Sequence, residues 1–119
     1  MNWYLAKLTY RIICGDGRHT AQFDEQLRLI IAEDEPEAFE KASSIGYREE
    51  ESFYNERQQL VRWQFIDVSE LHHLDVMVDG AELYSSIKEV DEPDNYIAWT
   101  HRKAEFLKEN YGQQLLQII

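Results

Sequence analysis

The sequence contains a single cysteine, only two prolines and no long apolar run in its 119 residues. Because Cys14 has no second cysteine to pair with, the chain cannot form an internal disulfide, and nothing in it points to an oxidising compartment. No stretch approaches the roughly 18 consecutive apolar residues of a membrane-spanning helix. Lys7 and Arg11 interrupt the first apolar stretch, which argues against a secretory signal peptide. We therefore expect a cytosolic protein without a membrane partner.

Positive charge is also scarce: 12 Lys and Arg stand against 23 Asp and Glu, which gives a formal net charge of −11. Residues 1–30 carry four basic and three acidic side chains, residues 31–92 carry five and 17, and residues 93–119 carry three of each. The acidic excess therefore lies between residues 31 and 92. This balance argues against general binding to nucleic-acid phosphates, which requires a basic surface. It fits a solvated surface or an acidic docking face for a basic partner.

The chain nevertheless has enough apolar material to fold. Hydrophobic residues make up 44% of the sequence and aromatic residues 13%, which argues against intrinsic disorder despite the charge. A chain of this length forms a core without disulfides or a structural metal, but it is too short for two independent cores. We predict a single domain, residues 1–119.

The first 32 residues predict a β-hairpin. In residues 3–14 an apolar set alternates with a mixed set, as in a strand with one buried face. The apolar set is Tyr4, Ala6, Leu8, Tyr10, Ile12 and Cys14. Two glycines then break the pattern in the segment CGDGRHT. Residues 21–32 resume it, with Phe23, Leu27, Leu29 and Ile31 on one side and Asp24, Gln26 and Arg28 on the other.

A helix is predicted next, over residues 35–45. Asp34 can accept hydrogen bonds from the free amides of the first turn, and Glu37 can complete a capping box. Gly46 supplies the stop.

The rest of the chain predicts two more strands and a second helix. Residues 60–68 and 81–90 alternate as strands, and residues 94–111 repeat apolar side chains at helical spacing. We expect residues 47–59 to be a connection and residues 69–74 to be a short turn or helical piece. The order β-β-α-β-β-α predicts an α+β fold, a four-stranded antiparallel sheet with two helices packed on one face, as a two-layer sandwich.

The hairpin loop holds the densest set of reactive groups. A thiolate nucleophile at Cys14 would need a base such as His19, and a carboxylate such as Asp16 to orient that base. Cys14, however, falls on the apolar side of its strand, where cysteine usually acts as a small hydrophobe. We predict no catalytic residue, and a small enzyme using the Cys14–His19 loop is the alternative.

The pair His72 and His73, followed by Asp75, could supply metal ligands. Adjacent histidines point apart on a strand or a helix, and no spacing typical of a metal site is present. We predict no metal site and no cofactor, and the role of the two histidines stays open.

A further alternative is a sheet surface that binds single-stranded nucleic acid. The first hairpin interleaves Trp3 with four cations, and stacking aromatics with cations form such a platform. The cations are Lys7, Arg11, Arg18 and Arg28. The net charge of −11 counts against this interpretation.

The remaining candidates are surfaces for a protein partner. The tail, residues 113–119, is apolar and must be buried against the chain itself or against a partner, so a homodimer through the tail is one hypothesis. Its contact residues would be Leu115, Leu116, Ile118 and Ile119. The acidic contact residues would be Glu37, Glu40, Glu49, Glu50 and Glu51.

Five short motifs extend over most of the chain: WYxAKLxYRI from Trp3, FDEQLR from Phe23, EAFxKA from Glu37, WxFIxV from Trp63 and GAELYS from Gly80. Together they resemble a small bacterial family known as domain of unknown function 4288. The resemblance covers roughly residues 3–90. It implies a bacterial, soluble, single-domain protein and carries over no catalytic or binding residues.

These observations favour a non-catalytic protein–protein interaction domain. Small acidic proteins can neutralise basic partners, and electrostatic steering speeds such an association. An acidic inhibitor or immunity-like protein is the specific form of this hypothesis.

Overall fold

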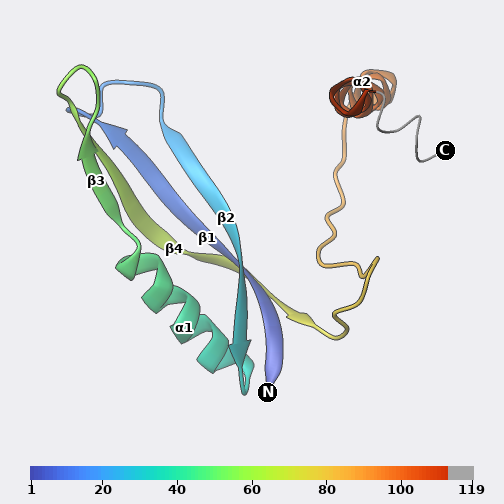
Figure 1. The fold of residues 1–119 in the computed structure, drawn as a ribbon, viewed down its shortest axis with the longest axis horizontal. Coiled ribbons are helices and arrows are strands. Elements are labelled where there is room, and N and C mark those ends of the chain that lie inside the picture. Colours follow the sequence, from blue (N-terminus) through green and yellow to red (C-terminus); the bar gives the residue numbers. More distant parts are fainter. Residues whose placement is uncertain (113–119) are drawn as a thin grey trace. The chain divides into compact units, whose positions relative to one another are not determined.

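A four-stranded antiparallel sheet forms the first part of the computed structural model, which describes residues 1–112 (Figure 1). Its strands are β1 (Asn2–Cys14), β2 (Gln22–Ala32), β3 (Glu51–Tyr54) and β4 (Leu60–Leu74), in the spatial order β2-β1-β4-β3. The α+β class, the antiparallel sheet and the element order β-β-α-β-β-α are confirmed.

The chain forms two compact units, Met1–Ser85 and Ser86–Ile119. The first contains the sheet and α1 (Glu35–Arg48), and the second contains α2 (Pro93–Tyr111). α2 buries none of its residues, so its predicted packing on the sheet stays a prediction, as does a single domain for the whole chain. Among the described residues, no helix has the length and apolarity to span a membrane. The predicted tail contacts at positions 115–119 lie outside the described residues.

The predicted strand at 60–68 forms as the first part of β4, but the predicted strand at 81–90 is wrong. The expected strand at 81–90 does not form, because a strand needs a neighbour for its backbone groups and this segment pairs with none of the described strands. The other sheet strand is β3, inside the predicted connection, where it pairs with the start of β4. β4 also continues through 69–74, the expected turn, because Trp3–Lys7 of β1 pair with Glu70–Leu74.

α1 covers one face of the sheet. Asp34 Oδ1 accepts from the Glu37 amide at 2.9 Å, and the Glu37 carboxylate accepts from the Glu33 amide at 3.0 Å, so the predicted start of the helix is confirmed. The helix continues beyond the predicted end, to Arg48. Its buried residues are small, which lets the helix approach the sheet closely; they are Ala38, Ala42 and Gly46.

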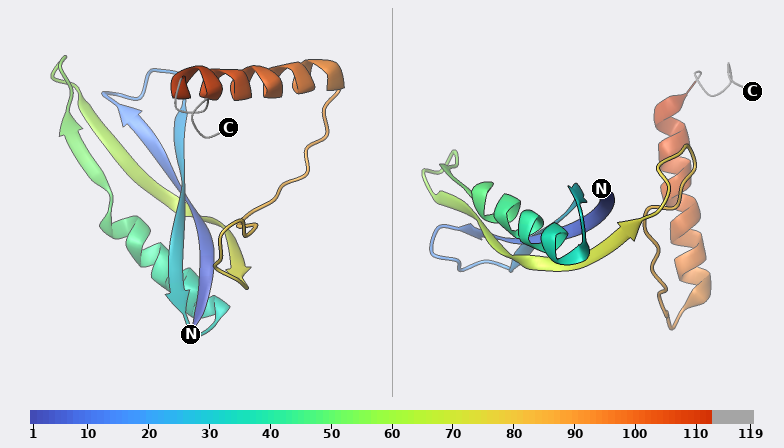
Figure 2. Two further views of the ribbon diagram at one scale, coloured as in Figure 1. Left: turned by 45° about the vertical axis from the view of Figure 1, so that its right-hand side comes forward. Right: turned by 90° about the horizontal axis from the view of Figure 1, so that it is seen from below.

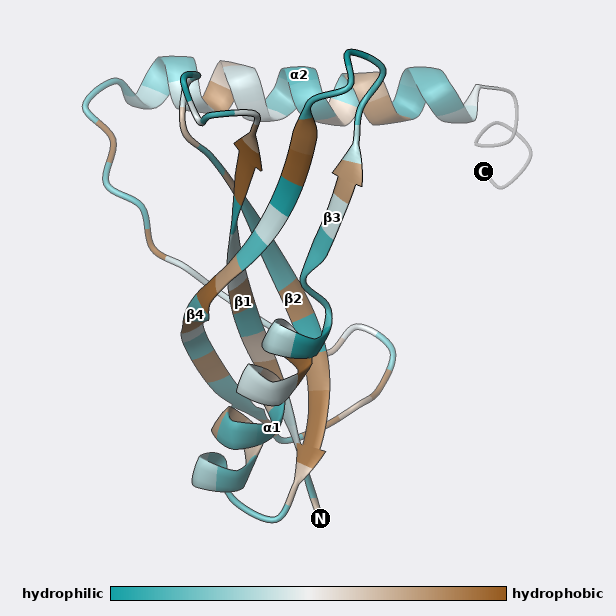
Figure 3. Ribbon diagram, turned by 90° about the vertical axis from the view of Figure 1, so that its left-hand side faces the viewer, coloured by the Kyte–Doolittle hydropathy of each residue, from teal (hydrophilic) through white to brown (hydrophobic). Residues whose placement is uncertain are grey.

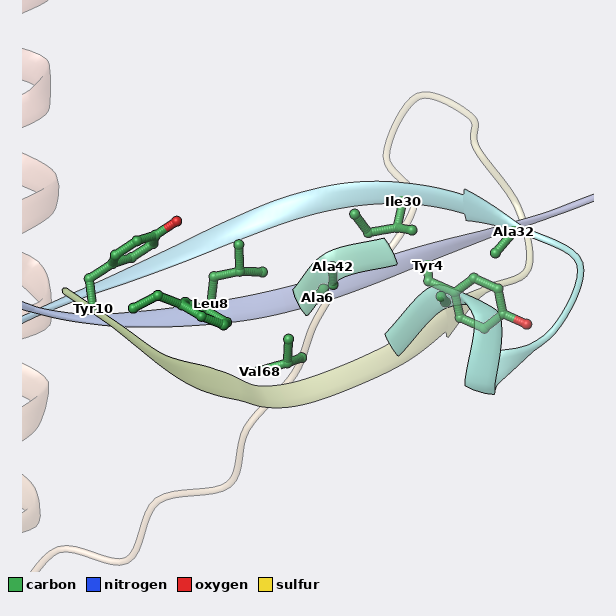
Figure 4. Close-up of a cluster of buried hydrophobic side chains, with 10 residues drawn as sticks. Tyr4, Ala6, Leu8, Tyr10, Ile30, Ala32, Ala42 and Val68 are labelled. Carbon is green, nitrogen blue, oxygen red and sulfur yellow. The ribbon is translucent and has the colours of Figure 1, made fainter. Parts of the chain in front are cut away.

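The core lies between α1 and this face. Figure 4 shows the side chains of alternate β1 residues pointing the same way, together with neighbours from β2 and β4. The predicted apolar register of β1 is confirmed over its first part: Tyr4, Ala6, Leu8 and Tyr10 are buried, whereas Ile12 and Cys14 are only half-buried. Ile30 of β2 and Phe65 of β4 complete the contact.

The pairing of β1 with β4 is interrupted at two places. The register shifts between Lys7 and Leu8 and again between Thr9 and Tyr10. Each extra residue in β4 bends the strand and increases its twist. Figure 2 shows the result, a curled sheet with α1 lying along its concave side.

Most apolar side chains of β2 lie on the face opposite α1, rather than on the face that α1 covers. Its pairing places Arg28 opposite Ala6 and Leu29 opposite Leu5, so the polar residues share the face that α1 partly covers. Its apolar set, Phe23, Leu27, Leu29 and Ile31, lies on the other face, which we call the open face. Figure 3 shows how apolar the C-terminal half of β2 is. The register with β1, fixed by the hairpin, determines this arrangement.

Gly46 gives a test of the packing between α1 and the sheet. A Cβ atom at this position would collide with the ring of Phe65, although alanine favours helices over glycine. We expect Gly46→Ala to lower the free energy of unfolding by about 1–3 kcal/mol, as overpacking does. The measurement is urea denaturation. The control is Ser44→Ala, on the exposed side of α1, for which we expect a change within about 0.5 kcal/mol. Equal stability of Gly46→Ala and the native protein would contradict the packing described.

Candidate functional site

A polar cleft opens on the covered face of the sheet, where α1 ends. Its volume is about 340 Å³. β1, β2 and β4 supply its floor, and the turn from α1 into β3 supplies its rim. The lining residues are Tyr10, Gln26, Arg28, Arg48, Glu49, Glu50, Glu51 and Trp63.

The cleft exists because α1 stops at Arg48 while the strands continue. Side chains of β2 that would be costly to bury beneath the helix lie beyond its end, half-buried. The sequence pattern predicts Asp24, Gln26 and Arg28 on one side of their strand but predicts no cleft there. The spacing of two residues places these side chains on the same side of the strand. The pairing of β2 with β1 shows that this side is the one that α1 covers.

A continuous chain of polar contacts crosses the cleft. Trp63 Nε1 donates to Asp24 Oδ2 at 3.1 Å, and Gln26 Nε2 donates to the same oxygen at 2.7 Å. Arg28 then donates to Gln26 Oε1 through Nη2 at 2.6 Å, and its Nη1 lies 2.7 Å from Glu49 Oε2. These contacts fix the orientation of each side chain, so the cleft is a preformed polar surface.

Two further contacts attach the cleft to the core. The Tyr10 hydroxyl donates to the Gly46 carbonyl at 2.9 Å, and Glu50 Oε2 accepts from the Phe65 amide at 2.9 Å. Burial, followed by the negative charge of Glu49, raises the pKa of the Tyr10 phenol. The phenol therefore stays protonated and keeps its hydrogen bond to the end of α1.

The five acidic candidates differ in what the structure leaves them free to do. Glu37 caps the start of α1, Glu49 pairs with Arg28, and Glu50 holds the β4 backbone. Glu40 and Glu51 are exposed and have no ion pair or hydrogen bond within residues 1–112. Glu49, Glu50 and Glu51 line one cleft, whereas Glu37 and Glu40 lie towards the other end of α1.

The predicted thiol–imidazole pair is not formed. His19 Nε2 accepts from the Cys14 backbone amide at 3.0 Å, and His19 Nδ1 lies 2.8 Å from the Thr20 carbonyl oxygen, to which it must donate. The Cys14 sulfur instead contacts the side-chain amides of Gln59 and Asn55, at 3.5 Å each. Both ring nitrogens of His19 thus bond to the backbone.

Asp16 also has a local role. Its carboxylate accepts from the Arg18 amide at 3.0 Å and lies 3.2 Å from Arg18 Nε. These contacts stabilise the turn of the hairpin and leave His19 without the carboxylate partner that a catalytic arrangement would use.

The adjacent histidines point to opposite faces of β4, as expected. His73 lies against Tyr4 and pairs with Asp75, whereas His72 lies on the open face. Within residues 1–112, no group of three or more His, Cys, Asp and Glu side chains is arranged to hold a metal ion.

On the open face, four side chains hold the segment that follows β4. Lys7 Nζ lies 2.5 Å from Glu70 Oε2, and Glu70 Oε1 lies 3.3 Å from His72 Nε2. The ring of Tyr84 lies 5.3 Å from that of His72 and 5.5 Å from Lys7 Nζ. Through Tyr84, this polar cluster joins the segment after β4 to the sheet.

The structure separates the residues proposed for nucleic-acid stacking. Trp3, Lys7 and Arg11 lie on the open face, Arg28 lies in the cleft on the other face, and Arg18 lies in the hairpin turn. The predicted platform therefore does not form as one surface.

The open face carries a second surface that sequence reasoning missed. Trp3, Leu27 and Leu29 remain 39%, 53% and 51% exposed although they are large and apolar. An antiparallel sheet whose second face meets water usually carries polar residues there. The sequence does carry a signal for this surface, because apolar residues occur on both sides of the strands in the first hairpin.

Comparison with known proteins identifies the family. Residues 3–85 match the family described as Domain of unknown function (DUF4288). The chain belongs to this family. No curated protein and no solved structure matches it.

The DUF4288 match ends where the first compact unit ends, at Ser85. The polar cleft, the open face and the cluster around Glu70 all lie inside the family domain, whereas α2 lies outside it. Tyr84, near the end of the match, belongs to the cluster that holds the last segment of the DUF4288 domain on the sheet.

The Lys7–Glu70 contact makes a testable prediction about pH. The hydrogen bond from Lys7 holds the pKa of Glu70 below its usual value, and Glu70 raises the pKa of Lys7. Because the pKa of Glu70 is lower in the folded state, its contribution to stability is present above the unfolded-state pKa and is lost as the pH falls through the folded-state pKa. We expect Lys7→Met to raise the pKa of Glu70, as followed by NMR titration of its carboxyl carbon.

Arg11→Met is the matched control, because it removes a cation from the same face that has no ion pair among the described residues. In this variant we expect Glu70 to titrate as in the native protein. An unchanged titration of Glu70 in Lys7→Met would show that Lys7 does not control it.

Proposed function

We propose that this DUF4288 protein is a non-catalytic protein-binding domain that contacts its partner through the open face of the sheet. The observation that carries the proposal is the exposure of Trp3, Leu27 and Leu29 on a face that α1 does not cover. Exposed apolar groups that lie together on a folded domain mark contact surfaces for other proteins. The face is preformed, because the strands that carry it are fixed by the core beneath α1.

The charge of the chain supports a basic partner. The acidic excess begins at residue 31 and includes the exposed side chains Glu40 and Glu51. Negative charge on the same domain as the apolar contact face attracts a basic protein over long distances, and salt weakens this attraction. Charge then sets the rate of encounter, whereas the apolar face supplies the buried contact. Neutralising a basic protein, as an acidic inhibitor does, is the specific form of this proposal.

Trp3→Glu tests the proposal directly. The substitution places a charge on the open face, and the exposure of Trp3 means that the fold should tolerate it. We expect the variant to bind its partner at least about tenfold more weakly, the range for an aromatic contact residue. The partner is captured from cell extract on the immobilised protein, purified, and titrated against each variant by calorimetry.

Phe39→Glu is the control, because Phe39 is an exposed aromatic residue on α1, in the other layer. It should bind like the native protein, and affinity should fall as salt is raised. A partner that binds Trp3→Glu as tightly as the native chain would rule out the open face as the contact.

A further inference from the structure

β2 is an edge strand, and most backbone groups on its outer edge are unpaired among residues 1–112. It is 11 residues long, and among the strands of residues 1–112 it pairs only with β1. Natural edge strands are usually protected by shortness, proline, a bulge or charged side chains. β2 has charged side chains at Asp24, Glu25 and Arg28, but it is long and has no proline and no bulge. The other edge strand, β3, has four residues.

The contacts of α1 show which backbone groups of β2 point outward. Lys41 Nζ donates to the Ile31 carbonyl at 3.0 Å, and the Glu37 carboxylate accepts from the Glu33 amide at 3.0 Å. Backbone groups of alternate strand residues point to opposite edges, so the odd-numbered residues of β2 point away from β1.

These α1 contacts occupy only the end of β2. From Phe23 to Leu29, the outward backbone groups have no hydrogen-bond partner among the described residues. The free stretch is therefore residues 23–29, and its centre is Gln26.

We propose that β2 pairs antiparallel with β2 of a second copy of this chain, around a two-fold axis at Gln26. The two sheets then continue as one eight-stranded sheet, with both α1 helices on the same side. A two-fold interface of this kind uses the same surface on both copies. The proposal rests on the backbone edge of β2 and not on the proposed function, although Leu29 belongs both to the open face and to this contact.

Two kinds of side-chain pair complement each other in this register, whereas Glu25 lies opposite Leu27 and gains no partner. Asp24 lies opposite Arg28 of the second copy, and Phe23 lies opposite Leu29, with each pair formed twice. Opposite charges and apolar side chains directly across a strand pair stabilise it. Phe23 and Leu29 are more than half exposed in the single chain, so the pairing buries them.

The existing contacts of Asp24 leave room for a cation. It accepts hydrogen bonds from Trp63 and Gln26, which are neutral donors, and it has no ion pair among the described residues. The distribution of charge also permits self-association here, because residues 1–30 carry a net charge of +1 and the acidic excess lies elsewhere.

Glu25→Pro tests the edge. The amide of residue 25 points outward, so proline removes a bond between copies but none to β1. By light scattering across a concentration series, we expect the native chain to reach twice 14.2 kDa and Glu25→Pro to stay at 14.2 kDa. The control is Glu25→Ala, which loses the same side chain but keeps the amide and should remain a dimer. Circular dichroism checks that both variants are folded.

A cysteine at the axis tests the register without disturbing the edge. In Cys14→Ser/Gln26→Cys, the new thiols face each other at a non-hydrogen-bonded pair, with Cα atoms about 4.5 Å apart. This spacing suits a disulfide, so we expect a covalent dimer on mild oxidation. The control Cys14→Ser/Gln22→Cys places the thiols far from the axis and should stay reduced.

Three results would overturn the proposal. One is a native chain that stays at 14.2 kDa at every concentration. Another is a dimer that persists in Glu25→Pro but is lost in a chain ending at Gly112, which would assign the contact to residues 113–119. The third is a dimer in which Gln26→Cys does not cross-link, which would refute the register even if Glu25→Pro failed to fold.

Discussion

The length of α1 limits what the sheet of this protein buries. Its 14 residues rise about 21 Å at 1.5 Å per residue, whereas the 13 residues of β1 extend about 43 Å. One helix of this length covers about half of one face. The main cluster of buried residues therefore forms beneath α1, and small residues on the helix allow the close contact that makes it dense. Beyond the end of α1 the same face becomes a polar cleft, and the other face stays exposed at Trp3, Leu27 and Leu29, although Leu5 and Leu74 are buried on it.

The three uncovered parts of the sheet have different chemistry and suit different contacts. The cleft is polar, and its side chains are hydrogen-bonded to one another, so it presents fixed charges rather than an apolar pocket. The open face is apolar and suits burial against a partner. The outer edge of β2 offers free backbone groups, which another strand satisfies better than a side chain does. The charged and the apolar surfaces of the sheet are therefore separate. Charge can steer a partner towards the domain while the apolar face forms the buried contact.

Much of the fold was predictable because it depends on local pattern. The alternation in β1 and the caps of α1 are local signals, and the structure confirms both.

The errors involve long-range pairing. Residues 81–90 alternate like a strand but find no neighbour, whereas Glu51–Tyr54 is too short to show a pattern and forms a strand because β4 lies beside it. The sequence predicts no cleft. Its charge pattern indicates Glu49, Glu50 and Glu51 as contact residues for a partner, and their place in one cleft with Arg28 and Trp63 depends on a register that the sequence does not display. Cys14 and His19 are close, but the direction of the imidazole separates them.

Amide hydrogen exchange along β2, followed residue by residue by NMR at low and high protein concentration, tests most directly whether a second copy completes this sheet. At low concentration the amides of Asp24, Gln26 and Arg28 should exchange slowly, because they bond to β1, and those of Glu25, Leu27 and Leu29 should exchange fast. At high concentration only the second set should slow. Exchange rates for Glu25, Leu27 and Leu29 that are the same at both concentrations would contradict a shared sheet and leave the edge of β2 in water.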